Sequence, residues 1–200
     1  MCLKEYWDDK AEMSKKARNH TKKMEYDYPS FISNAIKSTK IYDDGFIPSD
    51  KKSVDATEIH IVDIDSVGAI MLFSKFKTAV LNFSSYKRPG GMFINGSKAQ
   101  EECLCHESFL YNVLSKMKDF YSWNNEHKNR ALYLNRGLYT PNVLFKRGDV
   151  VKEVDVITCA APNWSTAKRY NMASEEENHR VLKSRIKFVL DMAKDNGVNI

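Results

Sequence analysis

Two adjacent carboxylates carry the strongest chemical signal in the sequence. Glu101 and Glu102 follow Gln100, shortly after a turn that contains Gly90 and Gly91, and an apolar helical pattern begins at once. Adjacent side chains on a helix project about 100° apart, so these two glutamates cannot flank one bond as the facing carboxylates of an ordinary glycosidase do. The spacing predicts that one carboxylate acts on a bond in a cleft while its neighbour grips an adjacent hydroxyl group.

Glu102 is the better candidate for acid–base chemistry. It precedes Cys105, Phe109 and Val113 by three, seven and eleven residues, on a stripe that we expect to face the core. Partial burial and a like-charged neighbour both raise the pKa of a carboxyl group, as a general acid requires, whereas a helix N-terminus lowers it. In the alternative interpretation, Glu101 and Glu102 only complement the helix dipole. The residues alone leave both interpretations open.

The glycine turn before these carboxylates is typical of a cradle for a phosphate or a ribose. It follows residues 78–83 (TAVLNF), a continuous apolar run that predicts a strand buried on both faces. Glycine lets the backbone approach a ligand closely, and the free N–H groups of a helix N-terminus carry partial positive charge. Adjacent glycines also occur in ordinary turns, so the turn by itself is a weak signal.

The remaining pattern predicts a layered α/β fold with helices on both faces of a mixed sheet. Apolar periodicity and strand-forming runs place the elements along the chain. The predicted helices cover residues 4–23, 30–38, 66–75, roughly 100–120 and 174–197. The predicted strands cover residues 58–64 (EIHIVDI), 78–83, two short runs around Tyr139 and Pro141, and 154–163, and we expect 78–83 and 154–160 to be central.

The ends of two helices carry recognisable signals. Ser30 is the predicted N-cap of the second helix, and Ser174 that of the last, where Glu177 completes a capping box. Gly197 is the predicted C-terminal stop of the last helix. The apolar face predicted for that helix consists of Val181, Ile186, Val189 and Leu190.

The organisation predicts one main domain with an N-terminal addition. Residues 41–53 read as a loop or a boundary, so we expect a helical segment over residues 1–53 and an α/β domain over residues 54–200. The chain ends where the alternation requires another strand. We therefore expect the core to lack its C-terminal strand, with apolar groups of the last helix and one sheet edge left exposed.

Composition narrows the class of protein. The chain has 200 residues, 42% of them hydrophobic, and a formal net charge of +5, which suits an anionic small molecule or a nucleic acid equally well. No apolar run approaches the ~20 residues of a membrane helix. No secretory signal is visible, so we expect a cytoplasmic protein with reduced thiols. Cys103, Cys105 and His106 lack the second cluster typical of a zinc site, so no metal is predicted.

Residues 80–111 (VLNFSSYKRPGGMFINGSKAQEECLCHESFLY) strongly resemble the signature of the microbial-type poly(ADP-ribose) glycohydrolases, a branch of the macrodomain fold. That signature is a glycine triplet, a spacer and Gln-Glu-Glu, preceded by a strand that ends in Leu-Asn-Phe. The likeness continues through LYTPNVLFKRG and VDVITCAAPN and covers most of residues 58–196. It implies a three-layer α/β/α macrodomain-like fold.

The resemblance also implies an activity that needs no cofactor. The family hydrolyses the ribose–ribose O-glycosidic bond, with polymers of ADP-ribose or ADP-ribosylated proteins as substrate. Glu102 would protonate the leaving 2′-hydroxyl group and then activate water, and Glu101 would hold the hydroxyl groups of the reacting ribose. The substrate-binding residues that the resemblance implies are Asn82, Gly90, Gly91 and Gln100.

Two departures from the family keep a second interpretation open. Met92 stands where the family has its third glycine. The family's second glycine-rich loop is expected after the helix that ends near Asn196, but the chain ends at Ile200 and does not include it. Both departures fit a non-catalytic ADP-ribose-binding macrodomain. A third interpretation, a basic nucleic-acid-binding protein, rests on the net charge alone, and we expect neither a specific nucleic acid nor a membrane as partner.

Several other residues have two interpretations. Asn163 either contributes to a site at a strand end or caps a helix, and the cap is favoured. Tyr121 and Trp123, with nearby basic residues, form a basic aromatic patch or, more in keeping with their surroundings, a solvated loop. His60 is predicted on the surface of a strand. Cys105 and Cys159 are predicted to be small core residues.

Overall fold

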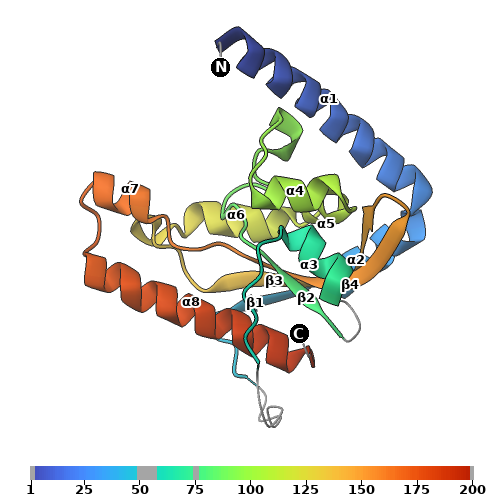
Figure 1. Ribbon diagram of the computed structural model, residues 1–200. Helices are drawn as coiled ribbons and strands as arrows, with labels where there is room; N and C mark the ends of the chain where they lie inside the picture. Colours follow the sequence, from blue (N-terminus) through green and yellow to red (C-terminus); the bar gives the residue numbers. More distant parts are fainter. Residues whose placement is uncertain (1–2, 49–57, 74–76, 199–200) are drawn as a thin grey trace.

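A four-stranded mixed sheet lies between two layers of helices in the computed structural model, which describes residues 3–48, 58–73 and 77–198 (Figure 1). The strand order is β1-β3-β4-β2, where β3 pairs antiparallel with β1 and β4, and β2 pairs parallel with β4. The strands are β1 Lys40–Asp43, β2 Ala79–Asn82, β3 Arg136–Arg147 and β4 Val150–Cys159. This arrangement confirms the predicted mixed α/β class.

The helices divide unequally between the two faces of the sheet. Helix α8 packs on one face, and most of the other helices lie over the opposite face or beyond its edges (Figure 1). The helices are α1 Leu3–Asp27, α2 Pro29–Ser38, α3 Ser66–Phe73, α4 Gln100–His106, α5 Leu110–Leu114, α6 Lys118–Glu126, α7 Trp164–Arg169 and α8 Glu175–Asp195. Two 3₁₀ turns, η1 Phe93–Asn95 and η2 Asn129–Ala131, complete the described elements.

Each face of the sheet has its own apolar core. The larger core joins the sheet to α1–α6 and contains Phe109, Leu110 and Val143. The smaller core joins the sheet to α8 and contains Ile157 and Phe188. Because β4 is covered on both sides, its residues 154–159 are all buried, as the unbroken apolar run predicted.

Two strand predictions were wrong. Residues 58–64 form no strand, and Ile59 and Ile61 are 87% and 96% exposed, because no strand among the described residues pairs with this alternating segment. His60 is on the surface as predicted, but not on a strand. Strand β2 occupies an edge of the sheet in the described part of the chain rather than a central position. The second predicted central strand, 154–160, is interior.

The helix predicted over residues 100–120 is broken into α4, α5 and α6. The chain turns between α4 and α5 because the Glu107 carbonyl oxygen accepts a hydrogen bond from Lys146 N and Ser108 forms a β-bridge with Phe145. Ser108 Oγ also accepts a bond from Leu110 N at 3.1 Å, which helps to start the next helix. Contacts with β3 therefore override the local helical pattern.

The two strand-like runs around Tyr139 and Pro141 belong to the single strand β3. Its register with β4 shifts between Thr140 and Val143, where Asn142 adopts a positive φ of 57°. Asp155 Oδ1 accepts a hydrogen bond from Asn142 N at 2.9 Å and holds this irregular point in place.

The predicted N-cap and C-terminal stop of α8 are confirmed, but the Glu177 carboxylate pairs with Arg130 instead of completing a capping box, and the buried face is displaced. Ser174 Oγ accepts a hydrogen bond from Glu177 N at 3.1 Å, and Gly197 ends the helix with φ +68°. Of the predicted apolar face, Val189 packs against the smaller core, but Ile186 and Leu190 are 55% and 63% exposed. The buried residues of α8 are Asn178, Arg185, Phe188 and Met192.

The N-terminal segment contributes directly to the sheet. Residues 40–43, at the start of the predicted loop, form β1 instead, and the predicted boundary between residues 53 and 54 lies outside the described residues. Helix α2 begins at Pro29 with Tyr28 as its N-cap, so the predicted Ser30 cap was wrong. A proline at the first helical position has the φ that a helix needs, which explains the earlier start.

Candidate active site

The glycine turn folds directly against the two carboxylates. It lies between the end of β2 and η1, and Gly90 and Gly91 both have positive φ, 62° and 57°. A Cβ atom on Gly91 would lie 2.6 Å from Glu102 Oε1 and 3.0 Å from Glu101 Oε2. A side chain at this position would therefore displace the carboxylates, so the close approach requires glycine.

Gln100 fixes the first turn of α4 at the end of β2. Its Nε2 donates to the Leu81 carbonyl oxygen at 2.8 Å and to Ser66 Oγ at 3.2 Å. Its Oε1 accepts from Phe83 N at 3.0 Å. Both polar atoms of this amide bind the protein itself, so the geometry gives Gln100 a part in positioning the glutamates.

Glu101 is buried, with 3% of its surface exposed, and both of its oxygens accept hydrogen bonds. Oε1 accepts from Asn82 Nδ2 at 3.3 Å, and Oε2 accepts from Ser85 N at 2.7 Å. Burial raises the pKa of Glu101 to about 7, helped by the charge of Glu102 and opposed by its hydrogen-bond donors. A group with this pKa is partly protonated at neutral pH.

Glu102 is equally buried, at 4% exposure, but only one of its oxygens has a partner. Oε1 accepts a hydrogen bond from Met92 N at 2.8 Å, whereas Oε2 has no partner among the described residues. The predicted stripe behind it, Cys105, Phe109 and Val113, is fully buried although α4 ends before Phe109. Glu102 thus lies at the edge of an apolar wall with one buried oxygen that no described protein group satisfies.

Asn82 supports the same group of atoms from β2. It is fully buried, and its Nδ2 donates to Glu101 and to Thr158 Oγ1, each at 3.3 Å. Thr158 is its register partner on β4. The Oδ1 atom of Asn82 has no partner within the described chain, so a second buried acceptor is available beside the carboxylates.

Glu101 and Glu102 line a cleft of about 400 Å³, whereas Asn82, Gly90 and Gln100 lie behind its wall. Its lining residues are Phe83, Ser85, Lys87, Arg88, Gly91, Met92, Ala99, Glu101 and Glu102. Lys87 and Arg88 are exposed, so carboxylates form the floor and cations the rim. Met92 has φ −113°, an ordinary value, so its side chain does not strain the turn, and Arg88 Nη1 lies 3.2 Å from its Sδ.

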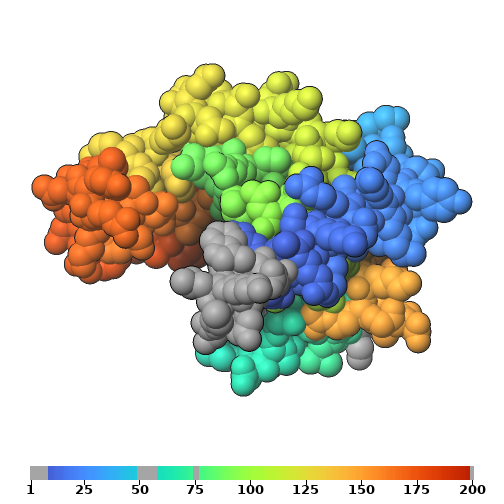
Figure 2. Space-filling model, turned by 90° about the horizontal axis from the view of Figure 1, so that it is seen from above, coloured from blue at the N-terminus to red at the C-terminus, as the bar shows by residue number. Residues whose placement is uncertain are grey.

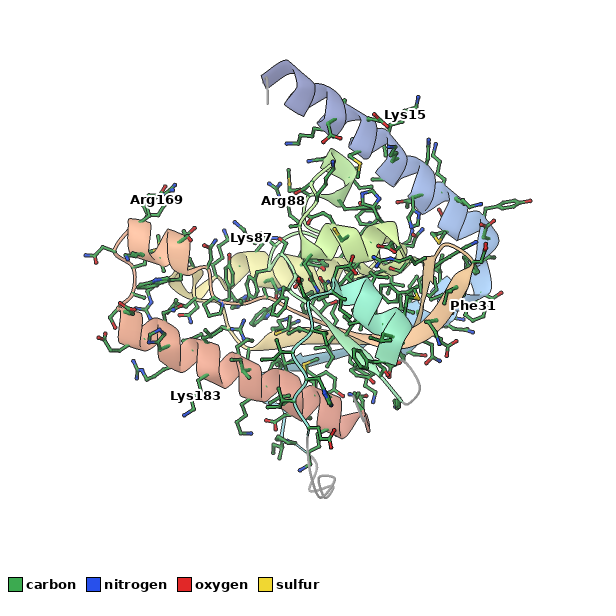
Figure 3. All side chains as sticks on the ribbon, in the orientation of Figure 1. Lys15, Phe31, Lys87, Arg88, Arg169 and Lys183 are labelled. Atoms are coloured by element: carbon green, nitrogen blue, oxygen red, sulfur yellow. The ribbon has the colours of Figure 1, made fainter. Side chains whose placement is uncertain are left out.

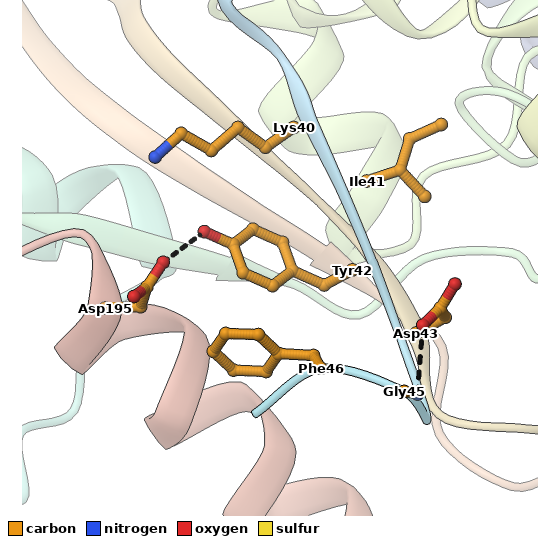
Figure 4. A pocket seen from close by; sticks show the side chains of 7 residues that line it. All are labelled: Lys40, Ile41, Tyr42, Asp43, Gly45, Phe46 and Asp195. Carbon is orange, nitrogen blue, oxygen red and sulfur yellow. Dashed lines mark hydrogen bonds between the residues drawn. The ribbon is translucent and has the colours of Figure 1, made fainter. Parts of the chain in front are cut away.

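A second cavity lies at the outer edge of the sheet, between β1, the turn after it and the end of α8 (Figure 4). Tyr42 donates a hydrogen bond to Asp195 Oδ2 at 2.7 Å there, and its ring meets Phe46 edge to face. None of the predicted site residues lines this cavity. The cleft at the glycine turn is therefore the candidate active site.

The remaining candidate residues serve the fold and do not line the cleft. Asn163 caps α7 by accepting a hydrogen bond from Thr166 N at 3.1 Å, which confirms the favoured interpretation. Tyr121 and Trp123 lie on α6, so the predicted solvated loop was wrong. Tyr121 is buried, and Trp123 stacks on His127. Cys105 and Cys159 are buried as predicted.

No cluster of three or more His, Cys, Asp or Glu side chains suited to a metal occurs in the part of the chain that the structure describes. Among the same residues, no helix is both long and apolar enough to cross a bilayer.

Sequence reasoning missed three contributors to the site. The backbone N–H groups of Ser85 and Met92 hold the carboxylates, and Thr158 holds Asn82. Backbone donors have no side-chain signal, and Thr158 comes from a strand 76 residues away. Only the parallel pairing of β2 with β4 could have indicated Thr158.

The fold and the carboxylate cleft define a macrodomain-like glycohydrolase class. The chain matches the microbial-type PARG catalytic domain over residues 9–148 and belongs to this family. No curated protein matches it.

Solved structures of similar proteins agree with this family assignment. The chain is 25% identical to the poly(ADP-ribose) glycohydrolase of Thermomonospora curvata, covering 94% of this chain and 77% of that one with a TM-score of 0.82. The Deinococcus radiodurans enzyme in complex with ADP-ribose is also 25% identical, over 81% of this chain and 70% of that one, with a TM-score of 0.69.

Proposed function

We propose that the protein hydrolyses the ribose–ribose O-glycosidic bonds of poly(ADP-ribose) and releases ADP-ribose. The observation that carries this proposal is the pair of buried adjacent carboxylates, of which Glu102 has one oxygen without a partner in the described chain. Similarity to the Deinococcus radiodurans enzyme crystallised with ADP-ribose supports the substrate class. Polymers or ADP-ribosylated proteins in the cytoplasm are the proposed substrates.

Glu102 is the proposed acid and base. Its Oε2 is the oxygen that can carry a proton without competing with a protein donor. In the first step it protonates the leaving 2′-oxygen while the bond from that oxygen to the anomeric carbon breaks. In the second step the Glu102 carboxylate takes a proton from water, and the water oxygen bonds to the anomeric carbon. The proton returns to Glu102, so one acid–base group completes the reaction.

Glu101 and Asn82 are proposed to hold the reacting ribose. Glu101 is fixed from two sides by Asn82 and Ser85, which keeps its carboxylate oriented for ribose hydroxyl groups. Asn82 Oδ1 is a further buried acceptor beside it. Two such acceptors could bind hydroxyl donors of one sugar while Glu102 acts on the neighbouring bond.

The glycine turn and its two cations are proposed to receive the diphosphate. Gly91 lines the cleft without a side chain, so phosphate oxygens can approach the backbone of the turn closely, whereas Gly90 is buried against the Tyr111 ring and lets the turn pack there. Lys87 and Arg88 at the rim supply the positive charge that a diphosphate needs. Gln100 supports the site indirectly by holding α4 against β2.

Incubation of the protein with purified polymer tests this function. Chromatography should detect released ADP-ribose, and isothermal titration should detect ADP-ribose binding. Binding without release would favour the non-catalytic alternative, for which Met92 in the cleft wall is the structural argument. Neither binding nor release would place the substrate site elsewhere.

A further inference from the structure

Two pairs of adjacent cations lie beyond the carboxyl ends of two neighbouring parallel strands. Lys87 and Arg88 follow β2, and Lys168 and Arg169 end α7, which follows β4. Strands β2 and β4 are parallel and in register, with Asn82 opposite Thr158. Their carboxyl ends therefore meet, and the segments beyond them emerge on one side of the molecule.

These four cations are exposed and are bound to no carboxylate within the described residues. The nearby Arg130, by contrast, is neutralised by an ion pair with Glu177. Figure 3 shows Lys87, Arg88 and Arg169 projecting on the same side of the molecule, with Lys183 of α8 on the opposite side. Seen from above, the surface is recessed between the α7 segment and the glycine-turn segment (Figure 2).

An exposed aromatic ring adjoins the outer pair. Tyr170 is 64% exposed and directly follows Arg169. The chain there is ordered by hydrogen bonds from Tyr170 N to the Thr166 oxygen at 3.2 Å and from Met172 N to the Ala167 oxygen at 2.8 Å. A guanidinium group binds phosphate, and an aromatic ring stacks on a base. Together they have the chemistry that recognises an adenine nucleotide.

We propose that Lys168, Arg169 and Tyr170 form an outer subsite for a second ADP-ribose unit of the polymer whose reacting unit lies in the carboxylate cleft. This inference rests on the proposed function. A polymer with a diphosphate and an adenine in every unit matches cations beside an aromatic ring. Because this outer subsite lies on the same side of the molecule as the cleft, the polymer is favoured over a nucleic acid as its occupant.

Arg169→Glu is the test variant, and Lys183→Glu is its matched control. Both remove one exposed helical cation and change the net charge equally, but on opposite sides of the molecule. Fluorescence anisotropy with an end-labelled ADP-ribose oligomer, in the Glu102→Gln background, gives the oligomer Kd at several salt concentrations. Isothermal titration gives the Kd for monomeric ADP-ribose.

We expect Arg169→Glu to weaken oligomer binding roughly threefold to tenfold and to reduce its salt dependence, because one phosphate contact is lost. The monomer Kd should not change, and Lys183→Glu should change neither value. Tyr170→Ala should also weaken only the oligomer. These differences would support the outer subsite.

Three results would overturn the subsite. One is equal oligomer affinity in Arg169→Glu and Lys183→Glu. A second is lower thermal stability of Arg169→Glu without a change in affinity, which would mean that the cation only serves the α7 dipole. The third is a single-stranded oligonucleotide that binds as tightly as the oligomer and loses affinity equally. Absence of monomer binding in the wild type would instead contradict the proposed function, so the two failures are distinguishable.

Discussion

The two neighbouring glutamates differ because the backbone around them differs. Glu101 accepts hydrogen bonds at both oxygens, whereas Glu102 accepts one and keeps Oε2 without a partner in the described chain. Helix geometry alone predicts that adjacent carboxylates have separate roles. The identity of the available oxygen depends on Met92 N and Ser85 N, which only the folded turn brings into position.

At Gly91 we expect Gly91→Ala to damage the site more than the fold. A non-glycine residue with positive φ costs about 1–2 kcal/mol, and the new Cβ would also meet both carboxylates. ADP-ribose binding, measured by isothermal titration, should therefore weaken by at least about tenfold. A loss of ~1.4 kcal/mol in binding free energy corresponds to a tenfold loss of affinity.

Gly148→Ala is the matched control for this substitution. Gly148 has φ +60°, but a Cβ atom at this position would have no neighbour within 4 Å, so only the conformational cost remains. Thermal unfolding should show a loss of stability for both variants, larger for Gly91→Ala because only its Cβ atom meets other atoms, whereas only Gly91→Ala should lose ADP-ribose affinity. Unchanged ADP-ribose affinity in Gly91→Ala would mean that the ligand does not bind at the glycine turn.

Glu101 should make stability depend on pH. Its pKa is about 7 in the folded protein against an ordinary 4.5, so the folded state binds this proton more tightly than the unfolded state. The resulting stabilisation is fully present below about pH 4.5 and is lost as the pH rises through 7, amounting to about 3 kcal/mol. Thermal unfolding between pH 5 and 8 measures the loss.

Glu101→Gln is the control for this pH effect, because it removes the titrating group. The stability difference between wild type and Glu101→Gln should shift across this range in favour of the variant at higher pH. A difference that stays constant from pH 5 to 8 would show that Glu101 ionises normally in the folded protein.

At the scale of elements, local pattern predicts the starts of α4 and α8 but misses the start of α2 and the break after α4. The start of α4 at Gln100 and the cap of α8 at Ser174 both follow from nearby residues. The break after α4 does not, because it depends on contacts of Glu107 and Ser108 with Lys146 and Phe145 of β3.

The buried face of α8 can be tested with two substitutions on the same helix. Phe188 is 7% exposed and belongs to the core beneath the sheet, whereas Leu190 is 63% exposed. Phe188→Ala should cost about 3 kcal/mol, and Leu190→Ala at most about 0.5 kcal/mol. Chemical denaturation should give these values, and a larger loss for Leu190→Ala would restore the face predicted from sequence.

At the scale of the whole molecule, the sequence predicts the fold class because apolar runs such as that of β4 require cover on both faces. It fails at residues 58–64, since alternation alone cannot show whether a partner strand exists. It also misplaces β2, whose half-buried residues lie at an edge of the described sheet. Pairing between distant segments is the information that local patterns lack.

Exposed apolar groups on α8 match one expectation for the whole chain. Leu182, Ile186 and Leu190 are 37%, 55% and 63% exposed at a four-residue spacing, and so form one stripe on the helix. The expectation of exposed apolar groups on this helix is thus confirmed.

The central claim is that Glu102 transfers the proton, and Glu102→Gln tests it most directly. Glutamine keeps the shape and hydrogen-bonding capacity of the side chain but cannot exchange a proton. Release of ADP-ribose from polymer should fall by a factor on the order of 10²–10⁴, the usual contribution of one acid–base group. ADP-ribose affinity should change little, since Glu102 acts mainly in the transition state.

Glu101→Gln, measured beside it, should weaken both binding and rate because its proposed role is to hold the ribose. The decisive result is the rate of Glu102→Gln. A rate about 10² lower or more, with ADP-ribose still bound, is the predicted result. Polymer hydrolysis by Glu102→Gln as fast as by wild type would contradict the mechanism, whatever the fold.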